Sequence, residues 1–349
     1  MMVIGIDAHK KTHTLVGVDA AGRPVGELTV AATTEGHLKA LGWARREFGA
    51  DLVWGVEDCR NLSRRLEHDL LDAGQRVIRV PPHLMARTRA SARTRGKSDP
   101  IDALAVARAV LREPDLPIAG HDEFSRRFKL LVDRRDNLVA HRTAVINRLL
   151  WRLHELDPEQ APKPGSLRRI NQQKAVQARL ADQPGLVAEL AGEELIEVMA
   201  LTTQIYALDH RIEAEIHAAN PLLLGIYGCG ELTAAKIIGE TAAVSRFRNE
   251  AAFARHAGTA PVPRWSGTNS TRVIGKRWGN RQLNNALYRI AMQQIQRNGP
   301  GRGYYQRRRD SGDSHLQALR RVERRLARKI FGCLCADEAA RTPQGEKRG

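Results

Sequence analysis

The sequence predicts an α/β domain at the N-terminus, a middle region of long coiled-coil helices and a mainly α-helical domain at the C-terminus. Residues 1 to about 112 alternate short apolar runs with helical patterns. Residues 128–156 and 198–212 instead repeat apolar side chains at spacings of three and four, and short helical stretches surround a glycine turn after Pro221. The expected domains are 1–115, 116–218 and 219–336, with a disordered tail at 337–349.

Short apolar or β-branched runs predict five strands, at residues 3–6, 14–18, 25–30, 52–56 and 77–80. The second and third runs flank the turn-forming residues 19–22, which indicates a hairpin. Thr33 or Thr34 can cap a helix after this hairpin, with an apolar face made of Leu38, Leu41 and Ala44. A second helix carries Leu62, Leu66 and Leu70.

Three early antiparallel strands followed by strand–helix alternation is the order of an RNase H-like domain. The alternative is a doubly wound nucleotide-binding fold, but no glycine-rich phosphate loop follows the first strand. The sequence therefore favours the RNase H-like fold.

The chain is strongly basic, with a formal net charge of +17 from 56 Lys and Arg against 39 Asp and Glu in 349 residues. This excess predicts a polyanionic partner, although a ribosome-associated or simply soluble basic protein could have the same composition. Four scattered cysteines match neither a disulfide framework nor a zinc site. With no signal-peptide pattern and no apolar run of membrane-spanning length, a cytoplasmic protein is expected.

Four acids are candidate metal ligands. Asp7 and Glu57 each end an apolar strand, where a charge is costly unless a cation or another partner compensates it. Asp99 and Asp102 lie three residues apart at the expected start of a helix that runs to about residue 112, so both face one side. Acids from two strands and a helix can hold Mg²⁺ or Mn²⁺ for phosphoryl transfer. The alternative, ordinary caps or surface acids, suits Asp99 better than Asp7.

Basic residues accompany these acids along the chain. His9 and Lys10 follow Asp7 and can contact phosphate, His9 being the weaker candidate. Residues 86–97 contain no acid and five cations, namely Arg87, Arg89, Arg93, Arg95 and Lys97. Beside the carboxylates this segment is expected to clamp phosphate, and a solvated loop is the alternative.

The two long helical patterns are separated by a segment at residues 158–185 that is rich first in Pro and Gly and then in Gln. The pair can form an antiparallel hairpin or the contacts of a coiled-coil dimer. A plain helical bundle within one chain agrees equally well with the periodicity.

The C-terminal domain combines a glycine turn with a long region free of acids. Gly228 and Gly230 precede a helix expected at residues 232–240, which favours a helix-hairpin-helix whose N–H groups face a DNA phosphate. Residues 251–309 contain twelve Lys or Arg and no Asp or Glu. Because a solvated face normally mixes both signs, this region is expected to line a phosphate-bearing partner.

A serine in this region is a candidate nucleophile. Ser266 lies in a turn bounded by Pro and Gly, where a metal or a base must take its proton. Spacing alone equally allows a loop serine that only contacts phosphate. The basic and aromatic residues nearby are expected to bind nucleic acid, the indole by stacking on a base: Arg264, Trp265, Lys276, Arg277 and Arg281.

Together these motifs resemble the IS-one-ten family of insertion-sequence transposases, which are relatives of the Piv-type DNA invertases. The resemblance covers residues 1 to about 335 in the family's order. It is carried by Gly-Ile-Asp-Ala-His-Lys at 5–10, Val-Glu-Asp at 56–58, Lys-Ser-Asp-Pro-Ile-Asp-Ala at 97–103, the Gly-Cys-Gly turn, Ala-Gly-Thr-Ala-Pro at 257–261, Trp-Ser-Gly at 265–267 and Gly-Asn-Arg-Gln-Leu-Asn at 279–284.

The resemblance implies a RuvC-like DEDD domain with Asp7, Glu57, Asp99 and Asp102 as the metal-binding tetrad, and a C-terminal serine that attacks DNA. Family members often have Ser-Ser-Gly at that place. Here Trp265 replaces the first serine, so Ser266 takes the nucleophile's role and Ser270 is the fallback.

The resemblance also implies a homo-oligomer, a dimer or tetramer, in which the carboxylate domain of one subunit meets the serine domain of another. A noncoding RNA can guide donor and target DNA in the family. The hypothesis from the sequence is therefore a site-specific DNA transposase and recombinase. One alternative is a RuvC-like nuclease or junction resolvase that uses water, and another is a non-enzymatic DNA- or RNA-binding protein.

Overall fold

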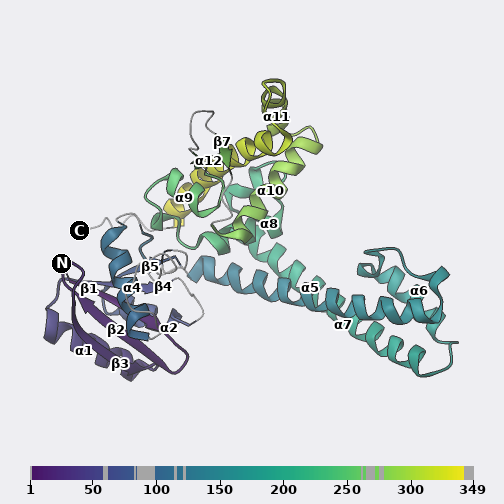
Figure 1. Cartoon of the computed structure of the whole chain (residues 1–349). Coiled ribbons are helices and arrows are strands. Elements are labelled where there is room, and N and C mark those ends of the chain that lie inside the picture. Colours follow the sequence, from purple (N-terminus) through teal and green to yellow (C-terminus); the bar gives the residue numbers. More distant parts are fainter. Residues whose placement is uncertain are drawn as a thin grey trace. The chain divides into compact units, whose positions relative to one another are not determined.

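A computed structural model describes residues 2–57, 62–81, 84, 99–113, 116–120, 123–260, 262–264, 272–274 and 279–341 (Figure 1). The chain forms two compact units, and each is discontinuous in sequence. The first comprises residues 1–122, 243–281 and 324–349, and the second comprises residues 123–242 and 282–323. The division into three consecutive domains stays a prediction.

Within the described part of residues 1–122, five strands form one sheet: β1 (Met2–Ala8), β2 (Thr12–Val18), β3 (Pro24–Ala31), β4 (Leu52–Glu57) and β5 (Arg76–Val80). The strand order is β3-β2-β1-β4-β5. The first three strands pair antiparallel, whereas β4 pairs parallel with both β1 and β5. This mixed order confirms the predicted RNase H-like sheet and differs from that of the doubly wound nucleotide-binding fold.

The turn between β2 and β3 forms where the sequence predicts it. The Asp19 carboxylate accepts hydrogen bonds from the N–H groups of Ala21 and Arg23, both at 2.9 Å. Gly22 has a φ of 75°, a left-handed conformation that glycine adopts without steric cost. This side-chain turn satisfies the backbone donors between the strands.

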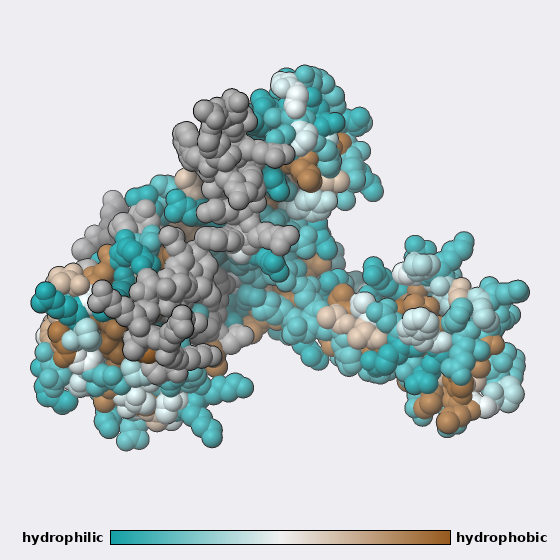
Figure 2. Space-filling view, in the orientation of Figure 1, coloured by the Kyte–Doolittle hydropathy of each residue, from teal (hydrophilic) through white to brown (hydrophobic). Residues whose placement is uncertain are grey.

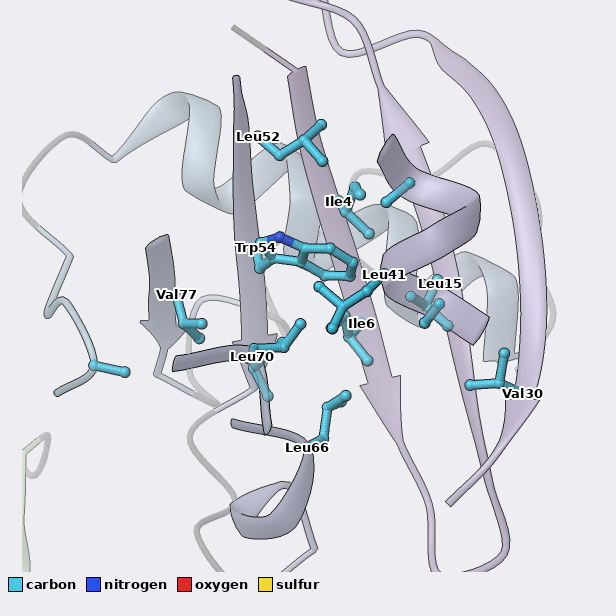
Figure 3. Packing of buried hydrophobic residues seen from close by; sticks show 14 residues of the cluster. Ile4, Ile6, Leu15, Val30, Leu41, Leu52, Trp54, Leu66, Leu70 and Val77 are labelled. Atoms are coloured by element: carbon cyan, nitrogen blue, oxygen red, sulfur yellow. The ribbon is translucent and has the colours of Figure 1, made fainter. Parts of the chain in front are cut away.

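Helices α1 (Thr34–Phe48) and α2 (Arg64–Asp72) cover one face of the sheet, and α4 (Asp99–Arg112) covers the other. Ile4, Ile6 and Trp54 belong to the core on the α1 and α2 side, which is shown in Figure 3. Val3 and Val53 belong to the core under α4. Alternate residues of each strand therefore serve opposite faces.

The predicted cap of α1 is confirmed, but one residue of its predicted apolar face is not. Thr33 Oγ1 accepts a hydrogen bond from the Gly36 N–H at 3.2 Å. Leu41 and Ala44 are buried, whereas Leu38 is 62% exposed. Because His37 occupies the inward position one turn before Leu41, Leu38 lies about 100° away around the helix.

The second unit contains an antiparallel hairpin of α5 (Glu123–Leu156) and α7 (Leu186–Ala219). Arg127 near the start of α5 pairs with Glu215 near the end of α7 at 2.6 Å, and Arg152 near the end of α5 pairs with Glu194 at 3.1 Å. Of the arrangements that the periodicity allows, the structure has the antiparallel hairpin within one chain, while a coiled coil and contacts with a second copy stay predictions.

Between the long helices lie η1 (Pro158–Gln160), η2 (Ser166–Arg168) and α6 (Ile170–Leu180), of which the sequence predicts none. Buried Val176 and Leu180 of α6 pack into the hairpin core. Figure 2 shows hydrophobic residues on the visible surface near the end of this hairpin, and Leu186 and Ile196 at the beginning of α7 are exposed.

The second unit continues with η3 (Leu222–Gly225) and α8 (Glu231–Thr241), and then with α10 (Arg281–Gln296) and α11 (Gly301–Asp310). α8 lies so close to α5 that a Cβ added at Gly239 would be 2.8 Å from the Lys129 Cα. Helix α12 (His315–Arg341) is divided between the two units, because its residues up to Glu323 belong to the second unit and those from Arg324 belong to the first. Because α12 runs to Arg341, the predicted disordered tail is wrong for residues 337–341, and residues 342–349 lie outside the described residues.

The first unit also contains η4 (Val244–Arg246), α9 (Glu250–His256), β6 (Val262–Arg264), β7 (Arg272–Ile274) and the second half of α12. Arg324 and Arg328 of α12 both bond to the Glu250 carboxylate. The Glu338 carboxylate accepts from the Val244 N–H at 2.7 Å. The end of α12 is thus held to α9 and η4. Of the described helices, none has the length and apolar character needed to cross a membrane.

Candidate functional site

The candidate site lies at the carboxyl ends of two neighbouring parallel strands. β1 and β4 pair in register, with Val3 opposite Val53 and Gly5 opposite Gly55. Two residues further along each strand, Asp7 and Glu57 therefore lie at the same level and on the same face of the sheet. That face is the one that α4 covers.

Two glycines bring α4 close to this sheet. A Cβ added at Gly5 would be 2.0 Å from the Ala103 carbonyl oxygen, and one added at Gly55 would be 2.7 Å from Val110 Cγ2. Gly5 is not among the glycines with positive φ, so contact with the helix backbone is the reason for a residue without a side chain. This role is not predicted from the sequence, because the register that places Gly5 beside Gly55 is set by the pairing of β1 with β4.

The close approach places the first turn of α4 over the ends of β1 and β4. Asp102 is buried, at 6% exposure, and the Asp99 side chain is 56% exposed. Both carboxylates act electrostatically on Asp7, as does Glu57. The structure thus brings together all four acids that the sequence selects.

Burial raises the pKa of Asp7, and the negative charges of Asp102, Asp99 and Glu57 raise it further, while His9 acts in the opposite direction. The Oδ2 atom of Asp7 is buried and has no hydrogen-bond partner among the described residues. Several carboxylates around a buried oxygen are costly without a counter-charge. A set of hard oxygen ligands of this kind fits Mg²⁺ or Mn²⁺.

His9 belongs to this cluster more closely than the sequence predicts. Its Nδ1 lies 3.6 Å from Asp7 Oδ2 and 3.9 Å from Asp99 Oδ2. One ligand atom from each of Asp7, His9 and Asp99 falls within 4.8 Å of the others. Lys10 is exposed in the connection from β1 to β2. Arg87, Arg89, Arg93, Arg95 and Lys97 lie outside the described residues.

The candidate nucleophile follows β6. Arg264 ends β6 and is the register partner of Arg272 at the start of β7. Trp265, Ser266 and Ser270 fall between these partners and lie outside the described residues, as do Lys276 and Arg277. The placement of Ser266 relative to the carboxylates therefore stays a prediction.

The glycine turn of the C-terminal region precedes α8 as predicted. Gly228 has a φ of 86°, and Gly230 precedes the first residue of α8. The segment before the turn, η3, is a four-residue 3₁₀ helix where the motif has an α-helix, so the helix-hairpin-helix stays a prediction. Arg281 is exposed at the start of α10.

Comparison with solved structures finds partial alignments. RuvC of Thermus thermophilus aligns with 34% of this chain and 100% of its own, at 18% identity and a TM-score of 0.28. The same protein in complex with a Holliday junction substrate aligns with 34% of this chain and 99% of its own, at 17% identity and a TM-score of 0.27. The RNase H-like assignment rests on the strand order and not on these alignments.

Two curated relatives span nearly the whole chain. The uncharacterized 44.8 kDa protein of insertion element IS116 from Streptomyces clavuligerus is 28% identical, over 95% of this chain and 94% of that protein. The uncharacterized 42 kDa protein of insertion element IS900 from Mycobacterium paratuberculosis is 27% identical, over 95% of this chain and 92% of that protein.

Family models match both halves of the chain. A model described as "Transposase" matches residues 4–158, which include the strands and the helix that carry the four acids. A model described as "Transposase IS116/IS110/IS902 family" matches residues 220–306, which include the glycine turn and α10. The chain belongs to the IS116/IS110/IS902 family of transposases.

Proposed function

We propose that this transposase cuts and rejoins DNA strands by phosphoryl transfer at the site formed by Asp7, Glu57, Asp99 and Asp102. The observation that carries the proposal is the meeting of four acids at one end of the sheet, where burial and mutual repulsion raise the pKa of Asp7. Such an arrangement has no evident structural use, because it lowers the stability of the metal-free fold. It is expected where a cation is to be held.

Asp7 and Asp102, the two buried or nearly buried acids, would hold a divalent cation, with Glu57 and Asp99 completing the set from the adjacent strand and the helix. The bound cation supplies positive charge beside phosphoryl oxygens and lowers the pKa of a coordinated hydroxyl. His9, half exposed beside Asp7 and Asp99, is proposed to contact the scissile phosphate.

Ser266 is proposed as the nucleophile. Its Oγ attacks the DNA phosphorus, the new Oγ–P bond replaces the bond to the 3′ oxygen, and the serine proton ends on the released 3′-hydroxyl. The product is a DNA 5′ end linked to serine. A 3′-hydroxyl of the exchanged strand then attacks the same phosphorus, which reseals the DNA and returns Ser266.

The family resemblance extends this proposal to the assembly. A homo-oligomer would combine the carboxylates of one subunit with the serine of another, and a noncoding RNA would guide the DNA partners. Lys10 and Arg281, both exposed, are proposed to contact the nucleic-acid backbone together with the basic segments at 86–97 and 264–277.

The carboxylate site is tested by Asp7→Asn and Asp102→Asn in a recombination assay with Mg²⁺ or Mn²⁺. Both variants should lose recombination by a factor of at least about 10² while still binding DNA. Glu47→Gln, an exposed acid on α1, removes the same charge elsewhere and should recombine normally. Normal recombination by the Asp102 variant would refute the metal site.

The serine is tested by denaturing the protein during reaction with radiolabelled DNA. A protein–DNA adduct should survive denaturation in the wild type and in Ser270→Ala, and should be absent in Ser266→Ala. A metal-dependent enzyme that cleaves DNA without any adduct would instead be a nuclease that uses water, and an adduct on Ser270 would move the nucleophile.

A further inference from the structure

We propose that the outward face of α10 is a binding surface for double-stranded DNA, a role that rests on the proposed function and assigns it a specific surface. The residues buried on the opposite side recur at helical spacing: Leu283, Ala286, Leu287, Ile290 and Ala291. The other side is consequently fixed toward solvent. It presents Asn285, Tyr288, Arg289, Gln293 and Gln296, and Arg297 follows directly.

The composition of this face is unusual for a solvated helix. It combines side-chain amides, guanidinium groups and a 42% exposed tyrosine, Tyr288, and it contains no acid. In the same unit, the long helices α5 and α7 pair cations with acids, as Arg127 with Glu215 and Arg135 with Asp209. Arg289 and Arg297 have no acidic partner within the described ranges. Their charge is therefore available to a phosphate.

The glycine turn adjoins this face. A Cβ added at Gly228 would be 2.9 Å from Gln293 Cβ, and the buried Gln294 side chain donates to the Tyr227 carbonyl at 3.0 Å. The Tyr227 hydroxyl donates to the Arg297 carbonyl at 2.9 Å. The turn and α10 are thus joined by close packing and two hydrogen bonds, and α10 contributes the guanidinium and amide groups of the surface.

The geometry favours duplex DNA over duplex RNA. An α-helix with its side chains is about 10–12 Å across, which matches the B-form major groove, whereas the A-form major groove is too deep and narrow to admit it. Arg, Asn and Gln are the side chains that form paired hydrogen bonds with the edges of guanine and adenine. From Asn285 to Gln296 the face is about 16 Å long, enough to follow about five base pairs.

The test compares two double variants of the full-length protein. Arg289→Ala with Arg297→Ala removes one charge from α10 and one from the residue that follows it, and keeps the Arg297 carbonyl that Tyr227 uses. Arg45→Ala with Arg46→Ala removes two charges from the exposed side of α1, where Glu47 is adjacent. Melting temperatures equal to that of the wild type establish that both variants are folded.

Binding to a mixed-sequence DNA duplex of about 30 bp is measured by fluorescence anisotropy over a series of salt concentrations, with a duplex RNA of the same length in parallel. For the α10 variant the slope of log Kobs against log[salt] should become shallower by about 1.8, or about 0.9 for each lost phosphate contact. At about 0.15 M salt this corresponds to roughly 30-fold weaker DNA binding. The α1 variant should keep the wild-type slope.

Equal slopes for the two variants would overturn the assignment of α10. An equal loss of binding to the RNA duplex would overturn the choice of DNA. If the wild type bound no duplex DNA at all, the proposed function itself would fail, whereas recombination that is normal in the α10 variant with unchanged DNA binding would refute only the inference about α10.

Discussion

Replacing Gly5 by alanine tests whether the approach of α4 to the sheet builds the carboxylate site. The new Cβ would stand 2.0 Å from the Ala103 carbonyl oxygen and 2.4 Å from the Ala107 N, against 3.4 Å for ordinary contact. Both atoms belong to the helix backbone, which has no rotamer to change. The helix must therefore move outward as a body by about 1.4 Å, or the strand must bend.

This movement should lower the free energy of unfolding by about 3 kcal/mol, because it separates α4 from Val3 and Val53. That value is at the upper end of the usual cost of overpacking a core. It would also move Asp102 away from Asp7 by on the order of 1 Å, which is about twice the tolerance of a metal site. The variant should unfold at lower urea concentration. A population that remains folded should show no rise in melting temperature when Mg²⁺ is added.

Two further glycines provide a graded comparison. The Cβ that Gly55→Ala adds would lie 2.7 Å from Val110 Cγ2 and 3.1 Å from Val106 Cγ1. Because these side-chain atoms can adjust, the loss of unfolding free energy should be smaller, about 1–2 kcal/mol. Gly42 in α1 has nothing within 4 Å of an added Cβ, so Gly42→Ala should be neutral or stabilise the helix by up to about 1 kcal/mol. The reasoning is refuted if Gly5→Ala unfolds at the same urea concentration as the wild type and responds equally to Mg²⁺.

The remaining predictions concern titrating side chains. Because the pKa of Asp7 is raised in the folded protein, its contribution to stability is present at low pH and is lost as the pH rises through that pKa. Asp7→Asn should therefore melt at a higher temperature than the wild type near neutral pH without divalent ions. Mg²⁺ should stabilise only the wild type, and an equal response of the variant would contradict the site. Bonds from Arg324 and then Arg328 lower the pKa of Glu250 to about 2, so Arg324→Ala should cost about 1 kcal/mol at neutral pH after solvent screening. That difference in urea denaturation should shrink as the pH falls from 4.5 toward 2, and a constant difference would exclude the ion pair. Burial, and to a smaller extent His37 and His9, lower the pKa of His13 from 6.5 to about 4. The free energy of unfolding should therefore decline as the pH drops through that interval, and it should decline less in His13→Gln.

The sequence predicts the sheet well because its strands are short apolar runs between turns with clear chemistry. Helix α6 is missed because its Gln-rich sequence has few apolar residues, and it is held by the buried Gln173, which donates to the Leu167 carbonyl and to Thr202 Oγ1, both at 2.9 Å. The end of α12 is missed for a related reason. An acidic and polar segment looks like a tail, but Glu338 bonds to the backbone of η4, and only the fold shows this partner.

The sequence selects the acidic residues of the candidate site, but it does not predict how they are arranged in space. Asp7 and Glu57 stand out because each ends an apolar strand, but their common level depends on the pairing of Val3 with Val53, which is a tertiary property. His9 is undervalued for the same reason, since its distance to Asp99 depends on where α4 begins. Ser266 lies outside the described residues, and its selection rests on its motif.

The positions of Gly5 and Asp7 follow from one geometric requirement. A helix that delivers an acid to the end of a parallel strand pair must lie close to both strands, which excludes side chains at the point of crossing. Since residues two apart on a strand share a face, the glycine pair and the acid pair are separated by one intervening residue in each strand. The same closeness buries Asp7 among like charges and raises its pKa, so the packing that assembles the acids also destabilises their charged forms, a cost that the proposed cation would offset. Stability of the metal-free fold and readiness to bind metal are therefore expected to oppose each other at this site.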